Sequence, residues 1–249
     1  MNAVYALWLR QVKRFVRSRT RIVAALGQPL LFLVAFGFGF RQIYSQAGHG
    51  DYLQFLAPGI IGMTTMFAAV FTGVELIWDR QFGFLKETLV APVPRRLIML
   101  GRTAGGATVA VMQGSIVIAV CLLAGFRVNS LGAAVLGAVF MILIALLFTA
   151  FGSSMASVVQ DFQAFQLILQ FMVMPMFFLS GALFPLKNVP RPLQIVASID
   201  PFSYGVDGLR AALSGTGPQF GFAVDLAVLI TLAVFLVALG GRLFSKIQI

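Results

Sequence analysis

Three ionisable side chains lie within or beside the long apolar segments of this chain, and they are the first candidates for chemistry. Glu75, Arg102 and Asp225 each fall near the end of a segment. Ionisable groups inside a membrane are costly and by default mark functional sites. Close to an interface such groups can pair or reach water, so we expect structural roles for these three. A carboxylate near mid-segment would indicate ion-coupled transport, and the sequence places none there.

The lysines, the histidine and the cysteine exclude several enzyme classes. None of the lysines follows a glycine, so the chain has no G-x-x-x-x-G-K-[ST] loop to hold ATP phosphates. A single histidine and a single cysteine form neither an H-E-x-x-H motif nor a Cys/His cluster. We therefore predict no catalytic residue, no metal site and no cofactor bound by this chain. The residues concerned are Lys13, Lys86, Lys187, Lys246, His49 and Cys121.

The composition predicts an integral membrane protein. The chain of 249 residues is 59% hydrophobic and only 10% charged, whereas soluble domains are about 25% charged. Its net charge is +10, but the basic residues lie between the apolar segments, where they hold loops in the cytoplasm and contact anionic headgroups. We expect the lipid bilayer, and no nucleic acid, as a partner.

Six apolar segments are each close to the roughly 20 residues that a membrane-spanning helix needs. Because unpaired backbone groups are costly in lipid, we predict helices for all six and an all-α fold. The whole chain, 1–249, is then one transmembrane domain. The predicted spans are Ile22–Phe40, Phe55–Ile77, Thr103–Ala124, Leu131–Gly152, Ala164–Leu186 and Ala223–Gly241.

The basic residues predict the orientation of these spans, since Lys and Arg are enriched in cytoplasmic loops. With six spans, 13 of the 18 basic residues fall on one side, which we predict to be cytoplasmic together with both termini. The 13 are Arg10, Lys13, Arg14, Arg17, Arg19, Arg21, Arg80, Lys86, Arg95, Arg96, Arg102, Arg242 and Lys246; the other five are Arg41, Arg127, Lys187, Arg191 and Arg210.

Residues 1–21 predict an amphipathic helix in the inner membrane interface. At 100° per residue, four arginines share one face and six apolar residues share the opposite face. The helix either anchors the chain or faces a cytoplasmic partner, and the sequence favours neither. The two faces are Arg10, Arg14, Arg17 and Arg21, and Val4, Tyr5, Trp8, Val12, Phe15 and Val16.

The cytoplasmic segment 79–92 predicts a short helix with apolar faces. Phe82, Leu85 and Leu89 share one face, and Pro92 and Pro94 end the helix. Such a helix needs a cover in water. The inner leaflet, the neighbouring spans and a groove on a partner protein are all candidates.

The segment 187–221 on the opposite side predicts a helical hairpin that dips back toward the membrane. Asp200 is a good N-cap and Pro201 a good first helical residue. An apolar stripe follows, and Ser214-Gly215 ends the helix. Asp207 and Arg210 are spaced to pair at i,i+3. The stripe consists of Phe202, Val206, Leu209 and Leu213.

Three stretches together resemble the permease subunits of type-2 ABC exporters, the family of the daunorubicin-resistance permease and of polysaccharide-export permeases. They are Asp79–Pro92, the run Phe177-Phe178-Leu179-Ser180-Gly181-Ala182-Leu183-Phe184-Pro185, and Asp200-Pro201-Phe202-Ser203-Tyr204-Gly205-Val206-Asp207-Gly208-Leu209-Arg210. With six spans, the resemblance covers essentially the whole chain. Asp200 departs from the family, where Asn is expected more often, but both residues cap helices.

The resemblance implies two permease subunits, expected as a homodimer in a bacterial plasma (inner) membrane, and two ATP-binding cassette subunits that hold ATP and Mg²⁺. It implies a coupling helix that receives the ATPase motion and an external gate in the outer hairpin. The coupling residues would be Arg80, Phe82, Phe84, Leu85, Lys86, Glu87 and Leu89; the gate residues would be Phe184, Pro185, Asp200, Pro201, Tyr204, Asp207 and Arg210.

The aromatic residues favour an apolar substrate. The chain has 25 Phe against 4 Tyr and 2 Trp, and Met-rich surfaces adapt to varied apolar ligands. We expect a hydrophobic drug or a lipid-like substrate; a polysaccharide or lipid-linked glycan is the alternative, and a stand-alone secondary transporter or a membrane scaffold is a further one. The candidate pathway residues on span five, each also explicable by helix packing, are Phe171, Met172, Met174, Met176, Phe177 and Phe178.

Overall fold

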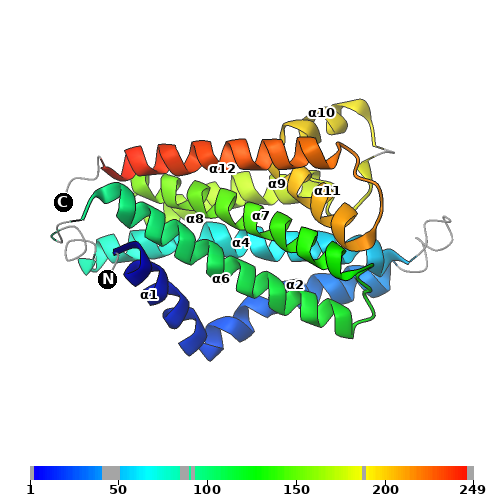
Figure 1. The fold of residues 1–249 in the computed structure, drawn as a ribbon, viewed down its shortest axis with the longest axis horizontal. Coiled ribbons are helices and arrows are strands. Elements are labelled where there is room, and N and C mark those ends of the chain that lie inside the picture. The colour runs from blue at the N-terminus through cyan, green and yellow to red at the C-terminus, as the bar shows by residue number, and fades with distance from the viewer. Residues whose placement is uncertain (1–2, 41–50, 85–89, 91–92, 187–188, 246–249) are drawn as a thin grey trace.

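The computed structural model describes residues 3–40, 51–84, 90, 93–186 and 189–245. Within these ranges the chain forms helices and turns and contains no strand, so the predicted all-α fold is confirmed. The helices run roughly along the long axis of the molecule, and the start of the first and the end of the last lie at the same end (Figure 1). We call this the basic end and the opposite end, which holds α10 and α11, the outer end.

Five helices of the described residues are long and apolar enough to cross a membrane. Each matches a predicted span. A sixth span results only if α1 (Ala3–Arg17) and α2 (Arg19–Gly39), which meet at a bend of 72°, count as one. The five are α4 (Tyr52–Gln81), α6 (Arg95–Leu123), α7 (Leu131–Val158), the run α8–η1–α9 (Phe162–Leu179) and α12 (Phe222–Ser245).

Helix α4 is the centre of the bundle. The most apolar 18-residue stretch of α4 is 83% buried, whereas that of α8–η1–α9 is 22% buried and that of α12 is 17% buried. Helix α4 packs against α2, α6, α7 and α11. Gly73 on α4 faces Gly152 on α7 so closely that a Cβ on either would meet the other helix's backbone. Small residues of this kind let helices approach in a membrane, where apolar burial alone gives no driving force.

The fifth span differs from the predicted continuous helix Ala164–Leu186. It consists of α8 (Phe162–Ile168), the π-helical turn η1 (Leu169–Val173) and α9 (Met174–Leu179). The physical reason is Pro175, which has no N–H to donate to the carbonyl of Phe171 and whose ring crowds that carbonyl. The backbone widens into a π-turn before the proline. The helix ends at Leu179, and Gly181 follows with a positive φ of 77°.

The predicted hairpin at the outer end is present as α10 (Arg191–Ile199) and α11 (Pro201–Ser214). The carboxylate of Asp200 accepts a hydrogen bond from the backbone N–H of Phe202 at 2.9 Å, which confirms the N-cap. Gly215 ends α11 with a left-handed φ of 68°. The predicted stripe of α11 is fully buried. Helix α11 packs mainly against α7, α4 and α12, the last of which is the sixth span, and it also contacts α9 of the fifth span.

Of the helix predicted over residues 1–21, α1 forms Ala3–Arg17, while Arg21 belongs to α2 beyond the bend, and α1 packs on its own chain. It lies along the basic half of α6, where Gly101 and Gly105 leave room for Leu7 and Gln11. The indole N–H of Trp8 donates to the hydroxyl of Thr108 at 2.9 Å. The predicted apolar face is divided, because Phe15 is buried whereas Tyr5 and Val16 are exposed. Helix α1 is therefore a docked part of the bundle and not only an interfacial anchor.

Candidate functional site

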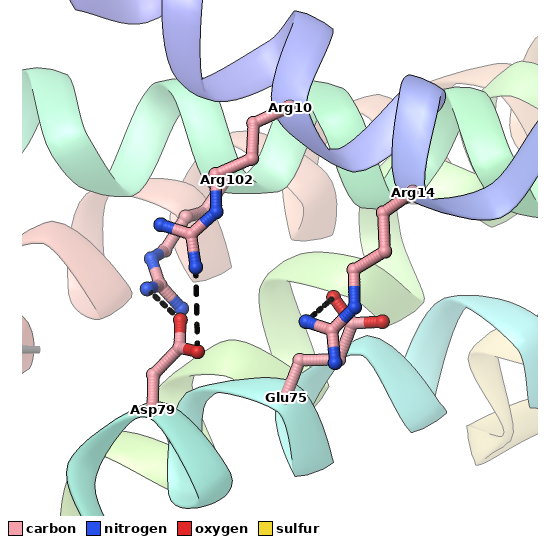
Figure 2. Close-up of polar contacts among 5 residues, drawn as sticks. All are labelled: Arg10, Arg14, Glu75, Asp79 and Arg102. Carbon is pink, nitrogen blue, oxygen red and sulfur yellow. Dashed lines mark hydrogen bonds and ion pairs between the residues drawn. The ribbon is translucent and has the colours of Figure 1, made fainter. Parts of the chain in front are cut away.

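A cluster of charged side chains joins α1, α4 and α6 at the basic end of the bundle. Asp79 on α4 lies between two arginines: the Arg102 guanidinium donates a short hydrogen bond to its Oδ2, and Arg10 Nη2 lies 3.5 Å from its Oδ1. Figure 2 shows Arg10 reaching down from α1 while Arg102 approaches from α6. Asp79 thus connects three helices through a single carboxylate.

A second pair repeats this arrangement one turn away. Glu75 precedes Asp79 by four residues on α4, and Arg14 follows Arg10 by four residues on α1. Residues four apart share a helix face, so two antiparallel helices bring both pairs into register. Arg14 Nη1 lies 4.0 Å from Glu75 Oε2 (Figure 2). We call Arg10, Arg14, Glu75, Asp79 and Arg102 the acid–arginine cluster.

Because part of the cluster is buried, its ion pairs are important for the stability of the bundle. Glu75, Asp79 and Arg102 are only 6–7% exposed, whereas the side chains of Arg10 and Arg14 are about half exposed. Removing one partner of a buried ion pair typically costs about 3–5 kcal/mol, because the other charge stays behind without compensation. The inner pair Asp79–Arg102 is therefore the part of the cluster on which the packing of α4 against α6 depends most.

Sequence reasoning found part of this cluster. Glu75 and Arg102, for which the sequence led us to expect structural roles, each form an ion pair, but the sequence analysis identified neither Asp79 nor the arginines of α1 as partners. A usable signal was present, since acids four apart on one helix and arginines four apart on another form matching ladders. Asp225, the third candidate, lies elsewhere in the fold, fully buried near the start of α12.

The predicted coupling helix is described only at its edges. Helix α4 ends at Gln81, Gly83 has a positive φ of 81°, and helical structure resumes at Phe84. Phe82 is 71% exposed and Phe84 51% exposed. Arg80 instead points into the bundle and donates from Nη2 to the carbonyl of Ser157 at 3.2 Å. The remaining predicted coupling residues, Leu85, Lys86, Glu87 and Leu89, lie outside the described residues.

The predicted gate residues Asp207 and Arg210 both form hydrogen bonds at the outer end. Asp207 accepts hydrogen bonds from the backbone N–H groups of Gln219 and Phe220, at 2.6 and 2.9 Å. Arg210 donates to the carbonyls of Phe55, Gly181 and Ala182 and lies over the Phe55 ring at 3.9 Å. The contacts shown for these two side chains thus lead to different parts of the fold, and the expected i,i+3 pair is not among them.

The other gate residues are structural in this conformation. Pro201 is the first residue of α11, and the hydroxyl of Tyr204 donates to the carbonyl of Ser198 at 2.6 Å. Phe184 and Pro185 are half-buried in the turn beyond α9. Burial raises the pKa of the Asp200 carboxyl to about 7, against the hydrogen bonds from Phe202 and Ser203, which lower it. The hydrogen bonds of Asp200 and Tyr204 thus fix α10 and α11 relative to each other.

The six candidate pathway residues fall into three groups by exposure. Phe171, Met172 and Phe178 are exposed on the surface of the fifth span, and Met174 and Met176 are half-buried. Phe177 is buried, and its ring contacts Phe32 of α2 and Phe67 of α4 at centroid distances of 5.8 and 6.4 Å. Phe177 therefore belongs to the core, and only the first group presents an apolar surface.

Two cavities that the sequence did not predict lie between α2, α4 and α6. One, of about 330 Å³, is near the acid–arginine cluster and includes Glu75 and Trp78 in its wall. The other, of about 720 Å³, is at the outer end and includes Asp51 and Arg127. Neither includes a residue of the fifth span. Only the packing of α2 against the bundle creates them, and no spacing along the chain indicates that packing.

Comparison with known proteins places this arrangement in a family. The model of the ABC-2 type transporter family matches residues 2–214, which include α1, the acid–arginine cluster and the outer hairpin. The chain belongs to the ABC-2 type transporter family. The resemblance found from the sequence is therefore confirmed, and the chain is a transport permease subunit with several membrane spans.

Relatives match over most of their length. The chain is 28% identical to the inner membrane transport permease YadH of Escherichia coli strain K12, over 99% of this chain and 94% of YadH. It is 31% identical to the transport permease ycf38 of Pyropia yezoensis, over 88% of this chain and 77% of the relative. It is 27% identical to nodulation protein J of Rhizobium leguminosarum bv. trifolii, over 84% and 80% respectively.

Proposed function

We propose that this chain is the membrane-spanning subunit of an ATP-driven exporter whose ATP is hydrolysed on a separate cassette subunit. The observation that carries the proposal is the acid–arginine cluster beside the segment that joins α4 to α6. The ion pair between Asp79 and Arg102 connects α4 and α6, the two helices that flank this segment. The contact between Arg10 and Asp79 connects them to α1. A push on the segment from outside the bundle would therefore act on three helices at once.

The segment also offers a docking surface for the cassette subunit. Phe82 directly follows α4 and is 71% exposed, and the segment continues through Leu85 and Leu89 on the same predicted face. Exposed apolar residues at the end of a span, next to arginines, suit a groove on a cytoplasmic protein. We assign ATP and Mg²⁺ to that partner, in two copies, one for each permease subunit.

We further propose a bacterial plasma membrane location with the basic end in the cytoplasm. The starts of α1 and α6 and the ends of α4 and α12 meet at this end (Figure 1). Arg10, Arg80, Arg95 and Arg242 lie there, which the preference of basic residues for cytoplasmic loops supports. The relative YadH is named an inner membrane permease.

A second copy of the chain completes the pathway in this proposal. The fifth span is the least covered together with α12, and Phe171 on it is 76% exposed. We place Phe171, Met172 and Phe178 on the pathway between the two copies, and the outer hairpin of each copy as the gate above it. A hydrophobic drug or lipid-like substrate suits these side chains, with a polysaccharide or lipid-linked glycan as the alternative.

The test is reconstitution of the permease with an ATP-binding cassette subunit from the same organism. The pair should co-purify, hydrolyse ATP in liposomes and accelerate when the transported compound is added. A permease that purifies alone and moves compounds without ATP would overturn the proposal in favour of a secondary transporter. A screen of apolar compounds against glycan lipids in the same liposomes decides between the two substrate classes.

A further inference from the structure

We propose that the cavity of about 330 Å³ between α2, α4 and α6 binds apolar organic cations, and that Glu75 selects them by charge. The inference deepens the proposed export function by naming a substrate class and a place for it. The cavity lies inside one chain, apart from the exposed residues of the fifth span. The inference follows from its aromatic wall, its acceptor groups and its charge.

The wall of the cavity suits a bulky apolar ligand. Met63, Phe67, Phe71 and Trp78 of α4 line it, opposite small residues of α2. Phe71 is 43% exposed and Trp78 39% exposed, so part of each ring is accessible to a ligand, while Trp78 also stacks on Phe162 of α8 at a centroid distance of 6.1 Å. Aromatic faces attract organic cations, and methionine adapts to ligands of different shape.

The polar groups of the wall are mainly hydrogen-bond acceptors. The hydroxyl of Thr64 donates to the carbonyl of Ile60 at 2.9 Å, and that of Thr72 donates to the carbonyl of Ala69 at 2.6 Å. Each hydroxyl has one proton, so what these oxygens can still offer a ligand is a lone pair. Gln28 and Gln113 add two amides, which can both accept and donate hydrogen bonds. A ligand with positive charge or N–H groups fits this wall better than one rich in acceptors.

The charge of the cavity wall discriminates between ligands more strongly than its hydrogen-bonding groups do. Of the described residues that line the cavity, Glu75 alone is charged, and it is 7% exposed. A buried carboxylate attracts a cation and repels an anion more strongly than an exposed one does. An anionic amphiphile, such as a phosphate-linked lipid, would bring a second negative charge to this wall. The site therefore selects against the glycan-lipid alternative.

Glu75 also connects the cavity to α1. The same residue lines a small neighbouring space with Arg10, Arg14, Asp79 and Arg102. Arg14 is at the limit of pairing distance, 4.0 Å, and its side chain is 45% exposed, so water screens its charge (Figure 2). A bound cation would approach Glu75 from the cavity and compete with Arg14. Ligand binding is thereby linked to the docking of α1.

The experiment uses the isolated permease in neutral maltoside micelles with two probes of the same shape and opposite charge, tetraphenylphosphonium and tetraphenylborate. The chain has two tryptophans, Trp8 and Trp78. Trp8→Phe leaves Trp78 as a single fluorescent reporter in the cavity wall. The phosphonium should change the fluorescence of Trp78 until the site is saturated. It should bind at least tenfold more tightly than the borate.

Two variants should change the affinity for the phosphonium in opposite directions. Glu75→Gln should weaken phosphonium binding by about tenfold and leave borate binding unchanged or stronger. Arg14→Gln removes the competing cation and should tighten phosphonium binding severalfold, which also keeps the test decisive if Glu75→Gln folds poorly. Asp51→Asn is the matched control, because Asp51 caps α4 at the outer end, where Asn serves equally well; it should bind both probes as the parent does.

Equal binding of both probes, no effect of Glu75→Gln, or an Arg14→Gln variant that binds the phosphonium no more tightly than the parent would each overturn the inference. Because no ATPase takes part, its failure is distinct from failure of the proposed function. A transported compound could stimulate the partner ATPase while the phosphonium leaves the Trp78 fluorescence unchanged. The permease would then be an exporter subunit that lacks this binding site.

Discussion

Asp79 on α4 accepts a hydrogen bond from the guanidinium of Arg102 on α6, and both side chains are buried at the end of the bundle where the connecting segment leaves it. The same carboxylate lies 3.5 Å from Arg10 on α1. One acidic residue therefore holds the two helices that flank the predicted coupling helix and the helix that begins the described chain. We expect these three helices to respond together to force on that segment.

Asp79→Asn should destabilise the permease. The change leaves Arg102 buried without its counter-charge, which costs about 3–5 kcal/mol. The thermal unfolding midpoint in detergent should fall by several degrees, and Asp79→Asn with Arg102→Gln should recover part of the loss. Asp51→Asn is the control with an unchanged midpoint. A variant with the midpoint of the parent would show that the pair is dispensable.

Phe82→Asp should disconnect the permease from its cassette subunit. Phe82 is 71% exposed, so the change should not harm folding, whereas an unpaired charge buried at a contact costs about 2–5 kcal/mol of binding. Co-purification should drop at least tenfold, with Leu85→Asp acting in the same direction. Ile199→Asp, equally exposed at the outer end, should co-purify normally. Normal co-purification of the Phe82 variant would contradict docking at this surface.

Asp200→Asn should change how stability depends on pH. Burial raises the pKa of Asp200 from 3.8 to about 7. Between these values the unfolded chain releases a proton that the folded chain keeps, so the carboxyl lowers stability as pH rises toward 7 and has no further effect above it. Asn caps the helix without this penalty. Thermal midpoints should be a few degrees higher for the variant at pH 8 and equal at pH 4; a pH-independent difference would refute this cause.

A disulfide between α4 and α11 should stop transport if the hairpin moves as a gate. A Cβ on Gly62 would lie 3.5 Å from a methyl carbon of Val206, close enough for a bridge between Gly62→Cys and Val206→Cys. In a Cys121→Ser background, oxidation should slow transport at least tenfold, and dithiothreitol should restore it. Each single-cysteine variant should transport normally under oxidation. Undiminished transport by the bridged protein would mean that α11 is a fixed cap.

The local structure of this chain followed from its sequence. The apolar segments predicted the spans, because in lipid a backbone must satisfy its own hydrogen bonds and a helix does so within one segment. Asp200, Pro201 and Gly215 predicted the limits of α11, because capping and a left-handed φ depend only on neighbouring residues. Pro175 carried an equally local signal for the break in the fifth span, which the prediction of a continuous helix overlooked.

Only the tertiary structure decided which helix faces meet. Asp79 is paired with Arg102, 23 residues away, and Arg210 donates to the carbonyls of Gly181 and Ala182. The cavity beside Glu75 exists because α2 packs against α4 and α6. In a soluble protein, apolar periodicity reports which face turns inward. In a membrane the lipid is as apolar as the core, so orientation is set by close contacts such as Gly73 with Gly152 and by a few buried charges.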